Sequence, residues 1–311
     1  MRRILNVAFD ILLCPFVYLG ARLLKKVNDR PLVRALLFKI GIFPIVDHYY
    51  QPPFIPPTDP RLKRTLPGID FNPQRQLAVL AEFDYNAELE KIPVGPVAEL
   101  EFSHANPMLA FYDAEYLYSV IRYFKPRRII EIGAGHSTLM AIAAITANRE
   151  SDAGYACEHI CIEPYEKKWL EKTSATIVRK KLEELPASFF AELSRNDILF
   201  IDSSHVIRPD GDVLVEVLEI VPTLNPGVLV HFHDIFTPRD YYDAWGTGTP
   251  IFMNEQYLVE AFLSFNPKFK IMGALNYLKT NYNQELLARC PITQKINPDH
   301  EAGSLWLRTV A

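Results

Sequence analysis

Apolar positions in the second half of the chain alternate between short continuous runs and stretches with helical spacing. The continuous runs, rich in β-branched residues, predict strands at 129–132, 159–162, 176–179, 197–201 and 228–232. Between them, apolar residues at every third or fourth position predict helices at 137–144, 166–172, 186–194 and 212–221. Strands separated by helices pair in parallel through right-handed crossovers. The pattern therefore predicts an α/β fold with a Rossmann-like, doubly wound sheet.

Further elements flank this alternation. Helical spacing at 77–90 and 111–124 precedes the first strand. A helix from 254 to 265 precedes two more apolar runs, at 269–274 and 304–309. The last two runs are close in sequence, which favours their addition to the edge of the sheet as antiparallel strands.

The first predicted strand ends in a turn with two glycines, Gly133 and Gly135, before an alanine-rich helix. This order is typical of the first unit of a doubly wound sheet, and a ligand is expected on the turn because glycine lets the backbone approach it. Ser137 or Thr138 can cap the helix. A dinucleotide-binding turn needs a third glycine at 138, where this chain has threonine, so a nicotinamide-dependent oxidoreductase is the weaker reading.

The second predicted strand ends in Glu163, and a carboxylate there can bind both hydroxyls of a ribose. With this acid and the sequence EIGAGHST at 131–138, the chain resembles the class I S-adenosylmethionine-dependent methyltransferases over residues 108–311. The resemblance implies S-adenosylmethionine as cofactor and an antiparallel edge strand on the sheet. It also implies a set of cofactor-binding residues at the strand ends: Glu131, Gly133, Gly135, His136, Ser137, Thr138, Glu163 and Asp202.

Acids and histidines end the fourth and fifth predicted strands. Asp202 and His205 follow the fourth strand, and His233 and Asp234 follow the fifth. Parallel strands present their carboxyl ends at one edge, so these four side chains are expected near one bound molecule. We expect His205 and Asp202 to be catalytic, because a histidine with an ordinary pKa near 6.5 suits a general base. A histidine that only orders the loop is the alternative.

Two carboxylates at neighbouring strand ends are also a candidate site for a hard cation. Here the chain resembles the metal-dependent branch of methyltransferases that act on sugar or catechol hydroxyls. By that resemblance Asp202 and Asp234 are metal ligands and His205 is the base. His233 stands where that branch has an acid, and its ring nitrogen would favour Mn2+ over the default Mg2+. In the alternative reading, both acids only fix their loops.

Residues 236–249, after the fifth strand, combine aromatic side chains with glycines. A loop of this length can close over a pocket and select the acceptor. Arg239 within it is a candidate partner for a carboxylate or phosphate, with a plain surface residue as the alternative. His231, by contrast, is expected to lie inside the sheet.

Composition changes the picture at the N-terminus. The 311-residue chain has 49% hydrophobic residues, a net charge of -4 and a pI of about 6.1, which do not favour a nucleic-acid partner. Residues 1–39, however, hold eight Lys and Arg against two Asp, a balance of +6 that points to an anionic surface. The four cysteines form no CxxC pair, which is in keeping with a reducing cytoplasm.

Residues 4–24 are mostly apolar, but Asp10 and Pro15 favour a helix lying at a membrane interface over one that spans the membrane. A second stretch at 31–40 has one apolar helical face. We expect peripheral attachment to the inner face of the membrane. Two helices packed on the catalytic domain or on a second subunit, and a cleaved signal peptide, are the alternatives. A homo-oligomer is left open.

Proline-rich residues 44–73 predict an extended linker. The expected organisation is a basic helical region at 1–43, a linker and accessory segment at 44–107, and a catalytic domain at 108–311. The leading function is O-methylation of a small hydroxylated or glycosyl acceptor. The alternative from a different class is a membrane-associated scaffold protein that binds the cofactor without turnover.

Overall fold

The computed structural model describes residues 11–20, 22, 30–42, 62–165, 167–241 and 252–311. The chain divides into two compact units, residues 1–55 and residues 56–311. In the first unit, residues 11–20 are helical and α2 spans Pro31–Lys39. Most of the predicted linker and most of the predicted loop at 236–249 lie outside the described residues.

No helix among the described residues combines the length and the apolar character needed to cross a membrane.

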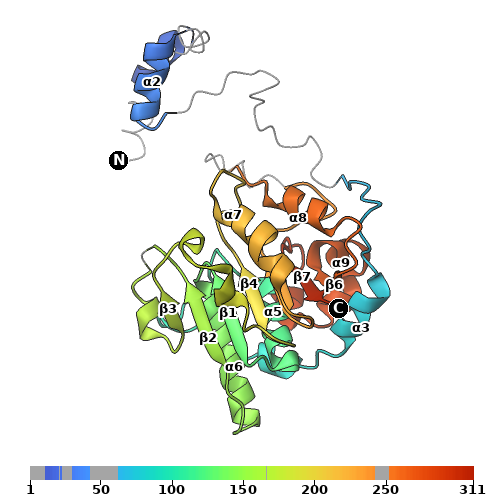
Figure 1. Cartoon of the computed structure of the whole chain (residues 1–311). Helices are drawn as coiled ribbons and strands as arrows, with labels where there is room; N and C mark the ends of the chain where they lie inside the picture. Colours follow the sequence, from blue (N-terminus) through green and yellow to red (C-terminus); the bar gives the residue numbers. More distant parts are fainter. Residues whose placement is uncertain (1–10, 21, 23–29, 43–61, 166, 242–251) are drawn as a thin grey trace. The chain divides into compact units, whose positions relative to one another are not determined.

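The second unit is built on a seven-stranded sheet with the strand order β3-β2-β1-β4-β5-β7-β6 (Figure 1). The first five strands pair in parallel, whereas β7 pairs antiparallel with both β5 and β6. The predicted doubly wound α/β sheet with an antiparallel addition is therefore confirmed. The strands are β1 (Arg128–Ile132), β2 (Glu158–Ile162), β3 (Thr176–Val178), β4 (Ile198–Ile201), β5 (Leu229–Phe232), β6 (Phe269–Ala274) and β7 (Leu305–Thr309).

The register of the parallel strands brings their carboxyl ends together at one edge. Ile132 at the end of β1 pairs with Ile162 of β2 and with Ile201 of β4. Ile201 in turn pairs with Phe232 at the end of β5. The segments that follow these four strands therefore start side by side, and the order reverses between β1 and β4, where ligands bind in sheets of this kind.

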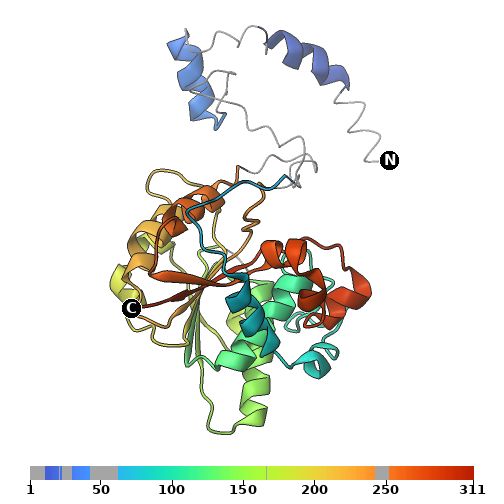
Figure 2. The same cartoon turned by 90° about the vertical axis from the view of Figure 1, so that its right-hand side faces the viewer.

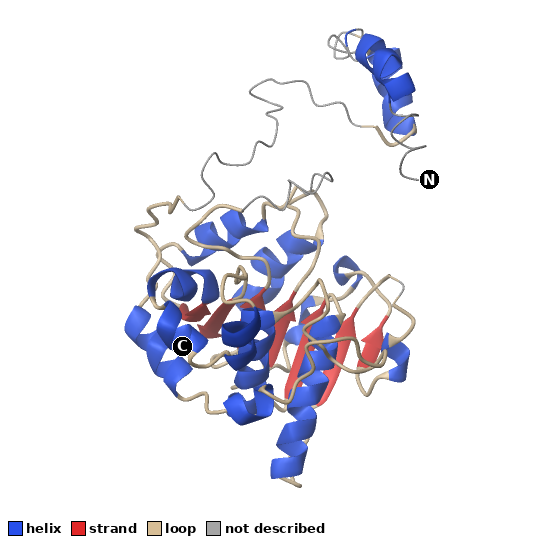
Figure 3. Ribbon diagram, turned by 180° about the vertical axis from the view of Figure 1, so that it is seen from behind, coloured by secondary structure: helices blue, strands red, loops and turns tan. Residues whose placement is uncertain are grey.

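Helices cover both faces of the sheet, because successive side chains of each strand point to opposite sides. Ile129 and Phe200 face one core with α3 (Pro73–Ala81), α5 (Phe111–Phe124) and α6 (His136–Ser151), which Figure 3 shows from behind. Ile130 and Leu199 face the other core with α8 (Glu255–Leu263) and the helical residues 212–223 (Figures 1 and 2).

Three predicted helices differ in the structure. The helix expected at 77–90 is split into α3 and α4 (Asn86–Leu89), because Phe83 between them turns into the core against Tyr116. The helices expected at 166–172 and 186–194 are reduced to the short 3-10 turns η2 (Leu170–Lys172) and η4 (Ala187–Phe190). Each of these turns buries a single side chain, so neither segment has an apolar stripe to stabilise a longer helix.

Three helices without a counterpart in the sequence analysis lie between β6 and β7: α9 (Leu275–Asn281), α10 (Asn283–Leu287) and α11 (Pro291–Ile296). The last of them, α11, is anchored on α5, where the buried Glu115 accepts hydrogen bonds from the backbone N–H groups of Ile292 (2.8 Å) and Thr293 (2.9 Å). Three short helices therefore separate the two antiparallel strands.

His104 is expected to make the free energy of unfolding fall in weak acid. Its side chain is buried, its Nδ1 accepts the N–H of Phe111 (2.9 Å), and burial lowers its pKa to about 4. Between pH 6.5 and 4 the unfolded chain takes up a proton at His104 that the folded chain does not. The contribution of the neutral His104 to the free energy of unfolding is therefore lost as the pH falls. His104→Asn keeps an acceptor for Phe111, and urea unfolding at pH 7 and 4.5 should show a loss about 2 kcal/mol smaller than in the wild type. Equal losses in both proteins would contradict this assignment.

Candidate active site

The glycine turn between β1 and α6 lies directly against the start of the loop after β4. Gly133 has a φ of +78°, and its N–H donates to the carbonyl of Ile162 (3.0 Å). The N–H of Asp202 donates to the carbonyl of Ile132 (2.9 Å), which holds the two loops together. A Cβ at position 133 would lie 1.9 Å from the backbone oxygen of Asp202. Only glycine fits this close approach.

A buried polar cluster supports the turn from beneath. Thr138 Oγ1 donates to Glu131 Oε2 (2.6 Å) and accepts the N–H of Gly135 (3.1 Å). The same carboxylate oxygen accepts from Cys161 Sγ (3.2 Å) and lies 3.2 Å from His159 Nε2. Burial raises the pKa of Cys161, which keeps its thiol protonated as a donor. These contacts link β1 and β2 to the glycine turn through Glu131 Oε2.

Glu131 and Thr138 thus have a different placement from the one expected of cofactor-binding residues. Neither side chain lines a cavity beside the turn. Thr138 occupies the position of the third glycine and uses its hydroxyl to hold the N–H of Gly135. The two residues shape the turn and do not face the space above it.

Glu163 stands between two adjoining pockets. Its Oε1 accepts the N–H of Tyr165 (2.8 Å) and its Oε2 accepts the N–H of Ala134 (3.3 Å). The first pocket, of about 660 Å³ with open solvent included, is lined by residues that include Pro164, Tyr165, Leu182 and Ser203. The second, of about 910 Å³ on the same measure, also borders Glu163 and is lined by Gly133, Gly135, His136, Ser137, Lys167, Asp202, His205, His233 and Asp234. Six of the eight expected cofactor-binding residues therefore line this second pocket.

Lys167 is a residue of this pocket that the sequence analysis missed. Its Nζ donates to the carbonyl of Ala134 (2.7 Å), and a Cβ on Gly135 would lie 2.9 Å from it. Burial lowers the pKa of the neighbouring His136, and the positive charge of Lys167 lowers it further. The only signal in the sequence was a lysine shortly after the acid at the end of the second strand. The turn therefore carries one ammonium group at its rim.

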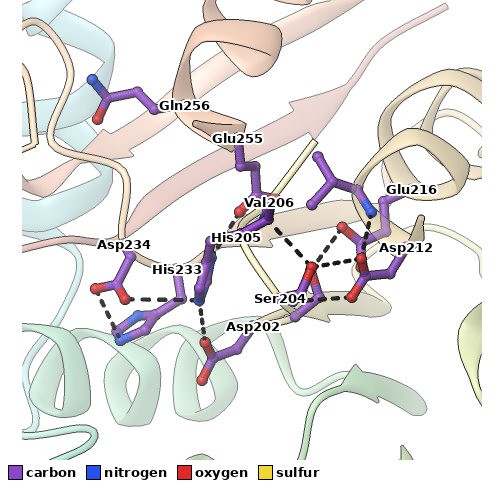
Figure 4. A network of polar contacts seen from close by, with 12 residues as sticks. Asp202, Ser204, His205, Val206, Asp212, Glu216, His233, Asp234, Glu255 and Gln256 are labelled. Carbon is purple, nitrogen blue, oxygen red and sulfur yellow. Dashed lines mark hydrogen bonds and ion pairs between the residues drawn. The ribbon is translucent and has the colours of Figure 1, made fainter. Parts of the chain in front are cut away.

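His205 is held among three carboxylates (Figure 4). Its Nε2 lies 3.2 Å from Asp202 Oδ1 and 3.7 Å from Asp234 Oδ2, and its Nδ1 lies 2.8 Å from Glu255 Oε2. The start of α8 fixes the loop, since the N–H of Asn254 donates to the carbonyl of His205 (2.9 Å). Glu255 is buried and was not found from the sequence, because it begins a helix instead of following a strand.

The neighbouring carboxylates raise the pKa of His205. Burial alone would lower the pKa of His205, but the hydrogen bonds with Asp202 and Glu255 outweigh it and raise the pKa well above 6.5. Burial would raise the pKa of Asp202, but His233 and His205 lower it to about 2. These contacts favour the protonated form of His205.

The three residues expected to bind a metal do not converge on one point. His205 Nε2 lies between Asp202 and Asp234, and His233 Nε2 is 3.8 Å from Asp234 Oδ1. Among the described residues, the one group of His, Cys, Asp and Glu with ligand atoms within 4.8 Å of one another is the cluster beneath the turn, Glu131, His159 and Cys161. Asp202, His233 and Asp234 form no such group in this arrangement of the described residues, and the metal stays a prediction.

His231 and Arg239 both take structural positions. His231 is buried in the sheet, stacked on Phe200 at 4.0 Å and hydrogen bonded to Ser304 Oγ (2.9 Å), as expected. Arg239 lies 3.7 Å from the carboxylate of Glu301 within the protein. Residues 242–251 of the loop that was expected to close over the pocket lie outside the described residues.

A mixed sheet with this strand order, a glycine turn after β1 and a carboxylate at the end of β2 make up the class I methyltransferase fold. Residues 130–235 match the family model described as a methyltransferase domain. This part of the chain is thus similar to a methyltransferase domain.

Individual relatives are distant. An uncharacterized protein of Archaeoglobus fulgidus is 28% identical over 138 residues, which are 42% of this chain, and the match spans 61% of that relative. The O-methyltransferase TomG of Streptomyces achromogenes, solved with S-adenosylmethionine, is 14% identical with a TM-score of 0.40, covering 75% of this chain and 90% of its own. An O-methyltransferase of Bacillus cereus, solved with S-adenosylhomocysteine, is 12% identical with a TM-score of 0.38, covering 75% and 91%.

Proposed function

We propose that the chain transfers a methyl group from S-adenosylmethionine to an oxygen of a small hydroxylated or glycosyl acceptor. The observation that carries the proposal is the pocket that runs from Glu163 past the glycine turn to Asp202 and His205. Glu163, which can bind a ribose, and His205, which can interact with an acceptor hydroxyl, thus border the same pocket. The cofactor supplies an activated methyl group, so the residues mainly have to bind, orient and handle one proton.

In this proposal, the two pockets bind different parts of the cofactor. Glu163 would accept hydrogen bonds from the ribose hydroxyls, and the first pocket, with Pro164, Tyr165 and Leu182, would take the adenine. Lys167 would pair with the carboxylate of the methionine part, since it is a cation beside the turn. The reacting end would then face Asp202 and His205.

His205 is the proposed proton acceptor and Asp202 its partner in orienting the acceptor hydroxyl. Because its pKa is raised, His205 must first release a proton to act as a base, so the rate should rise with pH. Met108, Leu109 and Met253 line the same pocket and would pack on apolar parts of the acceptor.

Paired binding measurements test the placement of the cofactor. Glu163→Gln should weaken binding of S-adenosylhomocysteine and of 5′-methylthioadenosine alike, by about tenfold or more, because both carry the ribose. Lys167→Met should weaken S-adenosylhomocysteine by a similar factor but leave 5′-methylthioadenosine unchanged, because that compound lacks the carboxylate. Titration calorimetry of both compounds with both variants gives the four values.

Two exposed residues outside the pockets, Lys168 and Glu158, provide matched controls. Lys168→Met removes the adjacent ammonium group, and Glu158→Gln changes an acid at the opposite end of β2; neither residue borders the two pockets. Both controls should bind like the wild type. A wild type that binds neither compound would refute the proposed function, whereas normal binding of S-adenosylhomocysteine by Lys167→Met would refute only the role of Lys167.

The second candidate is a scaffold protein that binds the cofactor without turnover. The raised pKa of His205 favours it, because the protonated form of a histidine cannot accept a proton. Cofactor binding at high affinity, with no methyl transfer to sugars or other hydroxylated compounds between pH 7 and 9, would select this candidate. Turnover that increases across that range would select the enzyme.

A further inference from the structure

Both described helices of the first unit leave apolar side chains exposed. In the helical residues 11–20, Ile11, Phe16 and Val17 are 67%, 73% and 66% exposed. On α2, Leu32 and Leu36 are 85% and 60% exposed, and the helix buries no residue. Exposed apolar side chains on two successive helices mark an interaction surface.

The charged side chains among residues 11–42 that the structure describes are all basic: Arg22, Arg30, Arg34 and Lys39. The guanidinium group of Arg22 lies 5.6 Å from the ring of Tyr18, and that of Arg34 lies 5.7 Å from the ring of Phe38. Basic groups thus sit directly beside exposed apolar side chains. This combination is typical of helices that lie in the interface of a membrane, with apolar side chains among the acyl chains and cations at the headgroups.

We propose that the helical residues 11–20 and α2 bind the surface of an anionic lipid bilayer. Charge selects this partner: a second copy of the segment would place its four described cations beside four more, whereas acidic headgroups neutralise them. The apolar side chains of 11–20 and α2 supply the rest of the binding by leaving water. The inference does not depend on the chemistry of the methyltransferase domain.

Flotation of the full-length protein with lipid vesicles tests this binding. The protein should float with vesicles of phosphatidylcholine mixed with phosphatidylglycerol and much less with phosphatidylcholine alone. Arg34→Glu/Lys39→Glu should weaken binding to the acidic vesicles by about tenfold or more, since each basic residue near such a surface contributes measurably. Leu32→Ser/Leu36→Ser should weaken it as well. Salt should weaken the wild type, because headgroup attraction is screened.

The matched control is Lys91→Glu/Lys180→Glu, which makes the same kind of charge change at exposed positions of the second unit. It should float like the wild type. Equal flotation of Arg34→Glu/Lys39→Glu and the wild type would overturn the role of the cations. The proposal would be overturned if the protein bound neither kind of vesicle and formed oligomers in light scattering that Leu32→Ser/Leu36→Ser abolished. The two helices would then form an interface between copies of the chain.

Discussion

Alanine at position 133 is expected to abolish binding of S-adenosylhomocysteine and to lower the free energy of unfolding by about 3 kcal/mol or more. The added Cβ would lie 1.9 Å from the backbone oxygen of Asp202, and the φ of +78° is itself unfavourable for alanine. Relief would require the glycine turn to move away from the loop after β4, which breaks the pocket. Titration calorimetry and urea unfolding measure the two effects.

Gly95→Ala is the control for this prediction, because no atom lies within 4 Å of its added Cβ and its φ is not in the left-handed region. It should bind and unfold like the wild type. Normal cofactor affinity in Gly133→Ala would show that the turn does not form the binding site.

Alanine at position 205 is expected to lower kcat by about 10² to 10⁴, the usual contribution of a general base, while the affinity for S-adenosylhomocysteine changes little. The reason is that His205 borders the acceptor end of the pocket, away from Glu163 and Lys167 in the proposed arrangement. The measurement is the rate with an acceptor that the wild type methylates. An unchanged kcat would reduce His205 to a residue that orders its loop.

The pH profile separates a proton-accepting His205 from a structural one. Glu255 raises the pKa of His205 through the hydrogen bond to Nδ1, so the acid limb of kcat/KM should lie above pH 6.5 in the wild type. Glu255→Gln removes that stabilisation of the imidazolium and should move the limb to lower pH. If Glu255 only supports the loop, Glu255→Gln would lower the rate at all pH values and leave the limb in place.

The sheet could be predicted because its strands carry their own signal. β1, β4 and β5 are mostly apolar and buried on both faces, and parallel pairing follows from the helices between them. The crossover at 166–172 was predicted as a helix because its local pattern allowed one. Its single buried residue, Leu170, gave tertiary packing too little to stabilise it.

The candidate site was predictable only where residues follow strands. Asp202, His205 and Asp234 come together because parallel strands end at one edge. Glu255 comes from the start of α8 and Lys167 from a loop, and no sequence spacing reveals that they reach His205 and the glycine turn. Glu131 was expected at the cofactor, but it lies on β1 two residues before the turn, and strand alternation points its side chain toward α6.

The place of β7 in the sheet has a consequence for biosynthesis. Residues 305–309 form an inner strand between β5 and β6, and the buried Asp113 of α5 fixes the preceding N–H groups of Gly303 and Ser304. A nascent chain that has emerged only as far as α11 has no partner for one edge of β5 and leaves β6 without a neighbour. During synthesis, this half of the sheet therefore cannot close until residues 305–309 have emerged from the ribosome.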